Sequence, residues 1–171
     1  MVELIPVISE NDIKKRIKEI GLKISEDYKD KDLVLIGILK GSFIFLADLS
    51  REISIDHEID FAAASSYEGT FSSGTVSITK DITIDIENKN VLLVEDFVDT
   101  GNTLYKLMDY FKSFNPKSIK ICSLIDKHER REVDIKVKYS CFFLEKGFIV
   151  GYGLDYNEKY RNLPAIYDLK L

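Results

Sequence analysis

One stretch of the sequence, VLLVEDFVDTGNTL from Val91 to Leu104, decides most of the fold. Its apolar start predicts a buried strand, and a helical pattern begins at its end. Between them lies a turn that carries acids, hydroxyls and a glycine. Such a junction exposes backbone N–H groups that suit a phosphate, while Glu95 and Asp96 can bind sugar hydroxyls or a hydrated cation. We interpret the stretch as a site for a phosphorylated sugar; a plain βα turn with solvated acids is the alternative.

Strands and helices alternate on both sides of this stretch. Ser9 and Asp12 resemble a capping box, and Ser42 is expected to cap a second helix. The expected helices are residues 10–28, 43–53 and 104–114, and the expected strands are residues 33–39, 59–63, 76–79, 91–94 and 119–125. This alternation predicts an α/β fold, a mostly parallel twisted sheet flanked by helices.

Two turns are expected to meet at one edge of that sheet. Residues 40–42 follow the strand 33–39, and residues 95–103 follow the strand at 91–94. Ligands in open parallel sheets bind beyond the carboxyl ends of the strands, so both turns can line a single crevice. A P-loop is absent from the sequence, and Gly151-Tyr152-Gly153 lacks the third glycine of a dinucleotide fingerprint.

The composition indicates one small globular domain. The chain has 171 residues, of which 45% are hydrophobic and 31% charged, and its net charge is -5. The negative charge opposes nonspecific binding to nucleic acid, and no apolar run is long enough for a membrane span. We expect a cytoplasmic protein with no nucleic-acid or membrane partner. Cys122 and Cys141 lie in strand-like surroundings without metal-ligand spacing, which favours buried free thiols.

Several segments together resemble the type I phosphoribosyltransferases, and specifically their hypoxanthine-guanine branch. The resemblance spans nearly the whole chain and rests on residues 91–104, 39–42, 66–67, 148–156 and 159–164. It implies a single domain over residues 1–171, with a small hood from about residues 1–8 and 127–171. The implied reaction moves a phosphoribosyl group from phosphoribosyl pyrophosphate to a 6-oxopurine, with Mg²⁺ as cofactor. Relatives form homodimers or homotetramers.

The resemblance also assigns roles to residues of the donor site. Asp99 matches the general acid/base that handles the proton at purine N7, and the peptide before Lys40 is expected to be cis. Without the family, Lys40 is a solvated turn lysine, Arg161 a surface residue, and Thr100 or Asn102 a plain helix cap. The implied ribose, 5′-phosphate and pyrophosphate ligands are Lys40, Gly41, Glu95, Asp96, Thr100, Gly101, Asn102, Thr103 and Arg161, and the implied metal ligands are Glu95, Asp96 and Asp155.

Purine recognition is assigned to the C-terminal part of the chain. In the family pattern Phe148 stacks on the base, Ile149 pairs with its edge through the backbone, and Lys127 donates to the exocyclic oxygen. From the residues alone, Phe148 is instead a core residue and Lys127 an exposed one. Ser66 and Tyr67 match a flexible loop that closes over the ribose.

The chain departs from the family at a few positions near the base, and these leave part of the function open. His128 stands where bacterial relatives commonly have proline, so the order of preference among hypoxanthine, guanine and xanthine stays open. The alternative function is a nucleotide-responsive regulator of RNA or DNA on the same fold. Such a regulator would have a basic face, which the acidic composition does not favour.

Overall fold

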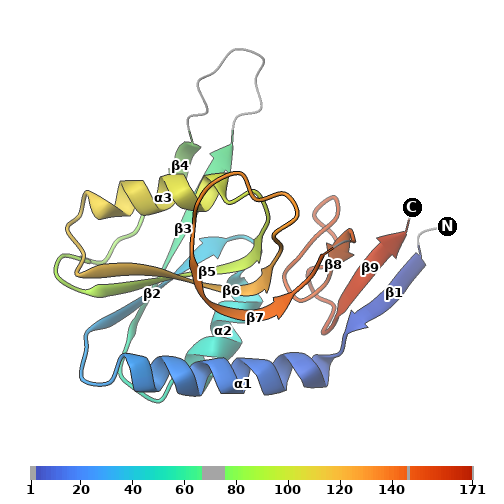
Figure 1. Cartoon of the computed structure of the whole chain (residues 1–171), viewed down its shortest axis with the longest axis horizontal. Coiled ribbons are helices and arrows are strands. Elements are labelled where there is room, and N and C mark those ends of the chain that lie inside the picture. Colours follow the sequence, from blue (N-terminus) through green and yellow to red (C-terminus); the bar gives the residue numbers. More distant parts are fainter. Residues whose placement is uncertain (1–2, 67–75, 146, 171) are drawn as a thin grey trace, which may run out of the picture.

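A six-stranded sheet with the strand order β4-β3-β2-β5-β6-β7 forms the centre of the molecule (Figure 1). The protein was analysed as a computed structural model that describes residues 3–66, 76–145 and 147–170. All neighbouring strands are parallel except β3 and β4, which confirms the predicted α/β class. The strands are β2 (Leu33–Leu39), β3 (Glu58–Ser66), β4 (Val76–Lys80), β5 (Asn90–Val98), β6 (Ser118–Asp126) and β7 (Val137–Phe143).

Helices cover both faces of this sheet. Helices α1 (Glu10–Asp27) and α2 (Phe43–Glu52) lie on one face, and α3 (Asn102–Lys112) lies on the other (Figure 1). Alternate residues of β2 therefore enter different cores: Leu35 packs on the side of α1 and α2, whereas Ile36 packs on the side of α3. This two-sided burial explains why the strand reads as a continuous apolar run.

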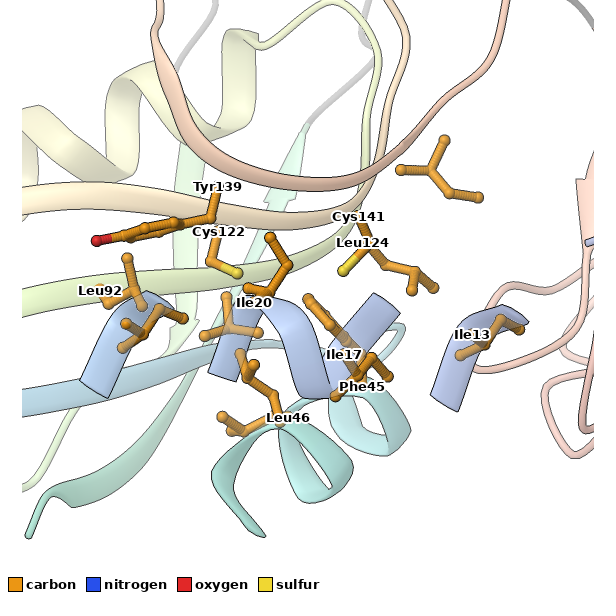
Figure 2. Packing of buried hydrophobic residues seen from close by; sticks show 14 of the residues in the cluster. Ile13, Ile17, Ile20, Phe45, Leu46, Leu92, Cys122, Leu124, Tyr139 and Cys141 are labelled. Carbon is orange, nitrogen blue, oxygen red and sulfur yellow. The ribbon is translucent and has the colours of Figure 1, made fainter. Parts of the chain in front are cut away.

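The face under α1 shows how the two cysteines are buried. Ile17 and Ile20 of α1 lie against the sheet close to Cys122 and Cys141, which come from β6 and β7 (Figure 2). Both cysteines are free, and burial raises the pKa of both thiols, that of Cys141 to about 12. The prediction of buried free thiols is confirmed, and neither is ionised near neutral pH.

A second, antiparallel sheet with the order β1-β9-β8 lies beside the end of β7 (Figure 1). Its strands β1 (Glu3–Ile8), β8 (Ile149–Val150) and β9 (Ile166–Lys170) come from the two stretches expected to form a hood. Strand β7 falls within the second stretch but belongs to the large sheet. No helix among residues 3–66, 76–145 and 147–170 is long and apolar enough to cross a bilayer.

The first two helices begin in different ways. Ser9 Oγ accepts a hydrogen bond from the N–H of Asp12 at 3.1 Å, which confirms the predicted cap of α1. Ser42 occupies the N-cap position of α2, as predicted, but its side chain makes no capping bond. Its hydroxyl instead donates to the carbonyl of Ile38 at 2.7 Å. A buried hydroxyl here satisfies a carbonyl at the end of β2 rather than an N–H of the helix.

Helix α3 also differs from expectation at both ends. Its N-cap is Gly101, with a left-handed φ of 84°, and neither Thr100 nor Asn102 occupies the cap position. The helix ends at Lys112, so Phe114 does not continue its apolar face and is exposed. A side chain at position 101 would strike Ile135, which explains why a residue without Cβ stands there.

Candidate active site

The two turns predicted to converge do meet. Strands β2 and β5 are parallel neighbours, with Gly37 opposite Val94, so their carboxyl ends reach the same edge of the sheet. A Cβ added to Gly41 would lie 1.8 Å from Asp96 Oδ2, so the two turns are in direct contact. The peptide between Leu39 and Lys40 is cis, as predicted.

A third segment, residues 151–161, closes against the same turn. A Cβ on Gly153 would lie 2.0 Å from the carbonyl oxygen of Gly41, and Gly153 itself has a left-handed φ of 101°. The guanidinium of Arg161 donates to the carbonyl of Gly153 at 2.8 Å. Backbone therefore packs directly on backbone between the C-terminal segment and the turn at the end of β2.

The cations at this junction are held by an acid that sequence reasoning missed. Glu158 lies 2.9 Å from Lys40 Nζ and 3.3 Å from Arg161 Nη2. The hydrogen bonds from Lys40 and Arg161 keep the pKa of the Glu158 carboxyl below its usual value. Arg161 is also 2.9 Å from Asp155 and mostly buried, so the interpretation of Arg161 as a surface residue is wrong. Lys40 is exposed but ion-paired rather than simply solvated.

The carboxylates of Glu95 and Asp96 form an unneutralised pair. Burial and the neighbouring Asp96 raise the pKa of Glu95 well above its usual range. Among the described residues, no salt bridge joins either acid to a Lys or Arg. No group of three His, Cys, Asp or Glu side chains in the same residues could hold a metal. The pair thus suits a divalent cation that takes its other ligands from a bound phosphate and water.

Asp99 stands where β5 passes into the turn before α3. Its Oδ1 is buried and has no hydrogen-bond partner among the described residues, and its Oδ2 lies 3.4 Å from Arg130 Nη1. Thr100 and Gly101 lead into the eleven-residue helix α3, whose first N–H groups have no partner within the helix. An acceptor and a set of N–H donors therefore stand next to each other.

The residues assigned to the purine reverse what hydropathy predicts. The Lys127 side chain is only 11% exposed and has its ammonium 3.7 Å from Glu129, whereas Phe148 is 52% exposed. The interpretations of Lys127 as exposed and Phe148 as core are therefore wrong. The Phe148 ring meets Tyr156 edge to face at 5.5 Å, and Ile149 follows in β8, paired with Asp168.

The remaining predicted residues include the loop. Ser66 ends β3, and Tyr67 lies outside the described residues, so the predicted loop closure stays a prediction. Sequence reasoning also missed Arg130 and Arg131, which approach Asp99 from a segment rich in charges. Nothing in the local pattern distinguishes these arginines from ordinary surface residues.

The chain is similar to known enzymes along most of its length. A family model described as "Phosphoribosyl transferase domain" matches residues 9–157. The hypoxanthine phosphoribosyltransferase of Escherichia coli is 49% identical over 163 residues, covering 94% of this chain and 92% of that protein. The hypoxanthine-guanine phosphoribosyltransferase of Streptococcus pneumoniae is 47% identical, with coverage of 96% and 92%.

Solved structures agree with the sequence relatives. The crystal structure of a hypoxanthine-guanine phosphoribosyltransferase from Bacillus anthracis superimposes with a TM-score of 0.94 at 45% identity, covering 100% of both chains. The crystal structure of a hypoxanthine phosphoribosyltransferase from Staphylococcus aureus gives a TM-score of 0.93 at 46% identity, covering 96% of this chain and 90% of that one. The family model, the sequence relatives and the solved structures agree: the chain belongs to the phosphoribosyltransferase family.

Proposed function

We propose that this protein transfers the 5-phosphoribosyl group of phosphoribosyl pyrophosphate to N9 of a 6-oxopurine. Hypoxanthine and guanine are the expected bases, and the products are IMP or GMP and pyrophosphate. The observation that carries the proposal is the contact of Gly41 with both Asp96 and Gly153. This contact brings Lys40, Arg161 and the pair Glu95 and Asp96 from distant parts of the chain to one edge of the sheet, which is called the rim below.

The two charged ends of the donor have separate binding groups on this rim. The N–H groups and hydroxyls of the turn, Thr100, Gly101, Asn102 and Thr103, are arranged to bind the 5′-phosphate at the start of α3. At the other side Lys40, the backbone of Gly41 and Arg161 are the donors for pyrophosphate. Glu158, which now pairs with both cations, must give way when the phosphates enter.

Acids of the rim act on the ribose and on the leaving group. Because no three acids gather at one point among the described residues, Glu95 and Asp96 would hold Mg²⁺ at the ribose and Asp155 would hold it at the pyrophosphate, and bound Mg²⁺ would neutralise charge on the departing pyrophosphate. Glu95 and Asp96 also accept hydrogen bonds from the ribose hydroxyls. Their negative charge favours the positive anomeric carbon that develops as the bond to pyrophosphate breaks.

Asp99 completes the transfer by taking a proton. As the bond from the anomeric carbon to N9 forms, the purine loses the proton at N7, and the Asp99 carboxylate accepts it. The Asp99 side chain is 22% exposed, and neither carboxylate oxygen accepts a hydrogen bond from another described residue, so the carboxylate is available to receive that proton. Ser66 and Tyr67 belong to the loop that we expect to exclude water from the cation-like centre.

Residues of the C-terminal part, one exposed and others buried, recognise the base. Phe148 exposes its ring for stacking, the Ile149 backbone pairs with the edge of the base, and Lys127 donates to the exocyclic oxygen. Adenine presents an amino donor at that position, so donor would face donor and leave buried polar groups unpaired. Adenine should therefore be a poor substrate.

The simplest test is direct. Purified protein is incubated with phosphoribosyl pyrophosphate, Mg²⁺ and one purine base, and nucleotide is measured by chromatography. We expect product from hypoxanthine and guanine and little from adenine; no nucleotide from any 6-oxopurine would reject the enzyme. Omission of Mg²⁺ tests the cofactor.

A regulator of RNA or DNA is not favoured, because the relatives reported above are named as enzymes.

The cellular setting forms part of the same proposal. We expect a homodimer or homotetramer in the cytoplasm. Light scattering of the purified protein measures its mass in solution, and fractionation of cells measures its location. A monomer, or recovery with the membrane fraction, would contradict these two expectations without touching the proposed reaction.

A further inference from the structure

A charged segment, residues 128–135, lies along the turn that carries Asp99. The N–H of Glu132 donates to the carbonyl of Thr100 at 3.0 Å, and the Glu132 carboxylate accepts a hydrogen bond from the Asn102 side chain. Ile135 fills the space where a Cβ of residue 101 would stand. The conformation of the turn thus depends on a segment that follows it by about thirty residues.

Arg131 is the most buried cation of this segment. Its side chain is 14% exposed, and its Nε donates to the carbonyl of Asp99 at 2.9 Å. Its Nη2 donates to the carbonyl of Lys127 at 3.2 Å and lies 3.5 Å from that of Val98. A planar guanidinium has enough N–H groups to serve all of these acceptors at once. One side chain therefore ties the end of β5 to the end of β6.

Asp126 fixes the guanidinium from the other side. It is the last residue of β6, its carboxylate is 4% exposed, and one of its oxygens pairs with Arg131. The other oxygen lies 3.0 Å from His128 Nε2. A charge pair this far from water must keep its geometry, because removal of one partner leaves the other charge buried without compensation.

We propose that Arg131 is a positioning residue for the transfer reaction, holding the backbone of Asp99 so that its carboxylate faces N7 of the purine. This inference rests on the proposed function. Oδ1 of Asp99 has no donor among the described residues, and Oδ2 has only the exposed Arg130 guanidinium at 3.4 Å, so the placement of the carboxyl depends mainly on the backbone that carries it. Of the atoms of Asp99, Arg131 bonds only the carbonyl oxygen, so it acts on the reaction through Asp99.

The same side chain also aligns the base. Arg131 holds the carbonyl of Lys127, and the N–H of Lys127 donates to the carbonyl of Val98 at 2.9 Å. The residue that binds the exocyclic oxygen and the residue that takes the N7 proton therefore share one anchor. A displacement of about 1 Å at a reacting group can lower a rate about a hundredfold.

The chain offers a matched control at Arg16. This arginine, on α1, also donates from Nε and Nη2 to strand carbonyls, those of Cys141 at 2.9 Å and Ser140 at 3.1 Å. Its bonds are of the same kind as those of Arg131, but they lie on the α1 face of the sheet. Arg16→Met thus measures the loss of such bonds where no reacting group depends on them.

The test compares Arg131→Met, Arg131→Lys and Arg16→Met with the unchanged protein. Thermal midpoints, binding of phosphoribosyl pyrophosphate by calorimetry, and kcat with hypoxanthine are measured for each. We expect Arg131→Met to lower kcat by about ten- to a hundredfold, with donor affinity within about threefold of the unchanged protein. Arg131→Lys, which keeps one charged bond, should recover part of kcat. Arg16→Met should change the midpoint but not kcat.

Each other outcome overturns the inference. If kcat of Arg131→Met equals that of Arg16→Met, Arg131 only stabilises the fold. If kcat and donor affinity fall by the same factor, the whole turn has collapsed and Asp99 is not specifically positioned. Should Arg131→Met fail to fold, the same comparison is made with Arg131→Lys, which must then lower kcat more than donor affinity. An inactive unchanged protein would instead reject the proposed function.

Discussion

Asp60 in β3 and the pair Glu95 and Asp96 in β5 are acids of the same sheet with opposite surroundings. Burial alone would raise the pKa of Asp60, but N–H donors from Thr83, Phe61 and Ile84 outweigh it and lower that pKa to about 2. The Glu95 carboxyl is buried beside another acid, and its pKa is raised. The chain satisfies the first acid and leaves the second pair for a bound cation or sugar. A structural acid is thus distinguished from a functional one by the source of its partners: the protein supplies the hydrogen-bond donors of the first, and a ligand would supply those of the second.

The largest expected effect tests whether the acids of the rim serve turnover rather than folding. Asp99→Asn removes the proton acceptor but keeps the shape of the side chain, so kcat should fall by about 10²- to 10⁴-fold. Steady-state kinetics measure kcat, and calorimetry measures the affinity for phosphoribosyl pyrophosphate, which should change little. Unchanged turnover would remove the role assigned to Asp99.

The next effect should appear in stability and not in activity. Asp60→Asn loses acceptor strength for three N–H groups, and we expect the free energy of unfolding in urea to fall by about 2 kcal/mol at neutral pH. The exposed Asp109→Asn is the control. Turnover of the folded Asp60→Asn protein should match the unchanged enzyme. A large loss of kcat would contradict the assignment of Asp60 to folding and of Glu95 and Asp96 to turnover.

The contribution of Asp60 to stability should also depend on pH. The pKa of Asp60 falls from 3.8 to about 2 on folding, so its stabilisation is complete above pH 4 and is lost as the pH falls from about 4 to about 2. The unchanged protein should therefore lose more stability over this range than Asp60→Asn does. Urea denaturation followed by circular dichroism at several pH values measures the difference. Parallel curves for the two proteins would contradict it.

Removing a charge from the acids of the rim should raise the stability of the protein, whereas Asp60→Asn should lower it. Glu95→Gln removes one of two adjacent acids, so in a chelator-containing buffer we expect the free energy of unfolding to rise by about 1 kcal/mol. Binding of phosphoribosyl pyrophosphate with Mg²⁺ should weaken at least about tenfold, since several charge-assisted contacts are lost. The exposed Glu87→Gln is the matched control. A less stable Glu95→Gln protein would mean that the chain itself satisfies this acid.

The smallest effect concerns Glu158, an acid satisfied by the cations of the site. Glu158→Gln frees Lys40 and leaves Arg161 paired with Asp155 alone, so the KM for phosphoribosyl pyrophosphate should fall by about two- to fourfold. Because Lys40 and Glu158 are exposed, the difference should shrink at high salt. Steady-state kinetics at low and high salt measure it. A higher KM would show that Glu158 organises the cations instead of competing for them.

Much of the frame could be predicted because it depends on short-range patterns. The apolar run of β2 and the period of α1 each reflect burial on known faces, and parallel strands bring their carboxyl ends together without further information. The meeting of Gly41 with Asp96 follows from that geometry. The role of Asp99, by contrast, came from a resemblance, since an acid in a turn is ordinary.

The rest was not predictable because it depends on long-range contacts or on ligands. Hydropathy predicts average burial, and it fails at Phe148 and Lys127, where the ring is exposed and the ammonium is buried; the proposed function assigns both to the base. Glu158 meets Lys40 across 118 positions of the chain, and nothing local marks that pairing. Arg131 likewise looks like a surface residue until its carbonyl partners are known.

The packing of Gly153 on Gly41 has a mechanical consequence. With a Cβ at position 153 only 2.0 Å from the oxygen of Gly41, the two backbones have no layer of side chains between them to deform. Any displacement that carries Lys40 toward a substrate must therefore shift residues 151–154 in the same sense. In the proposed function these two segments bind pyrophosphate and the purine, so we expect binding of one substrate to shift the groups that bind the other.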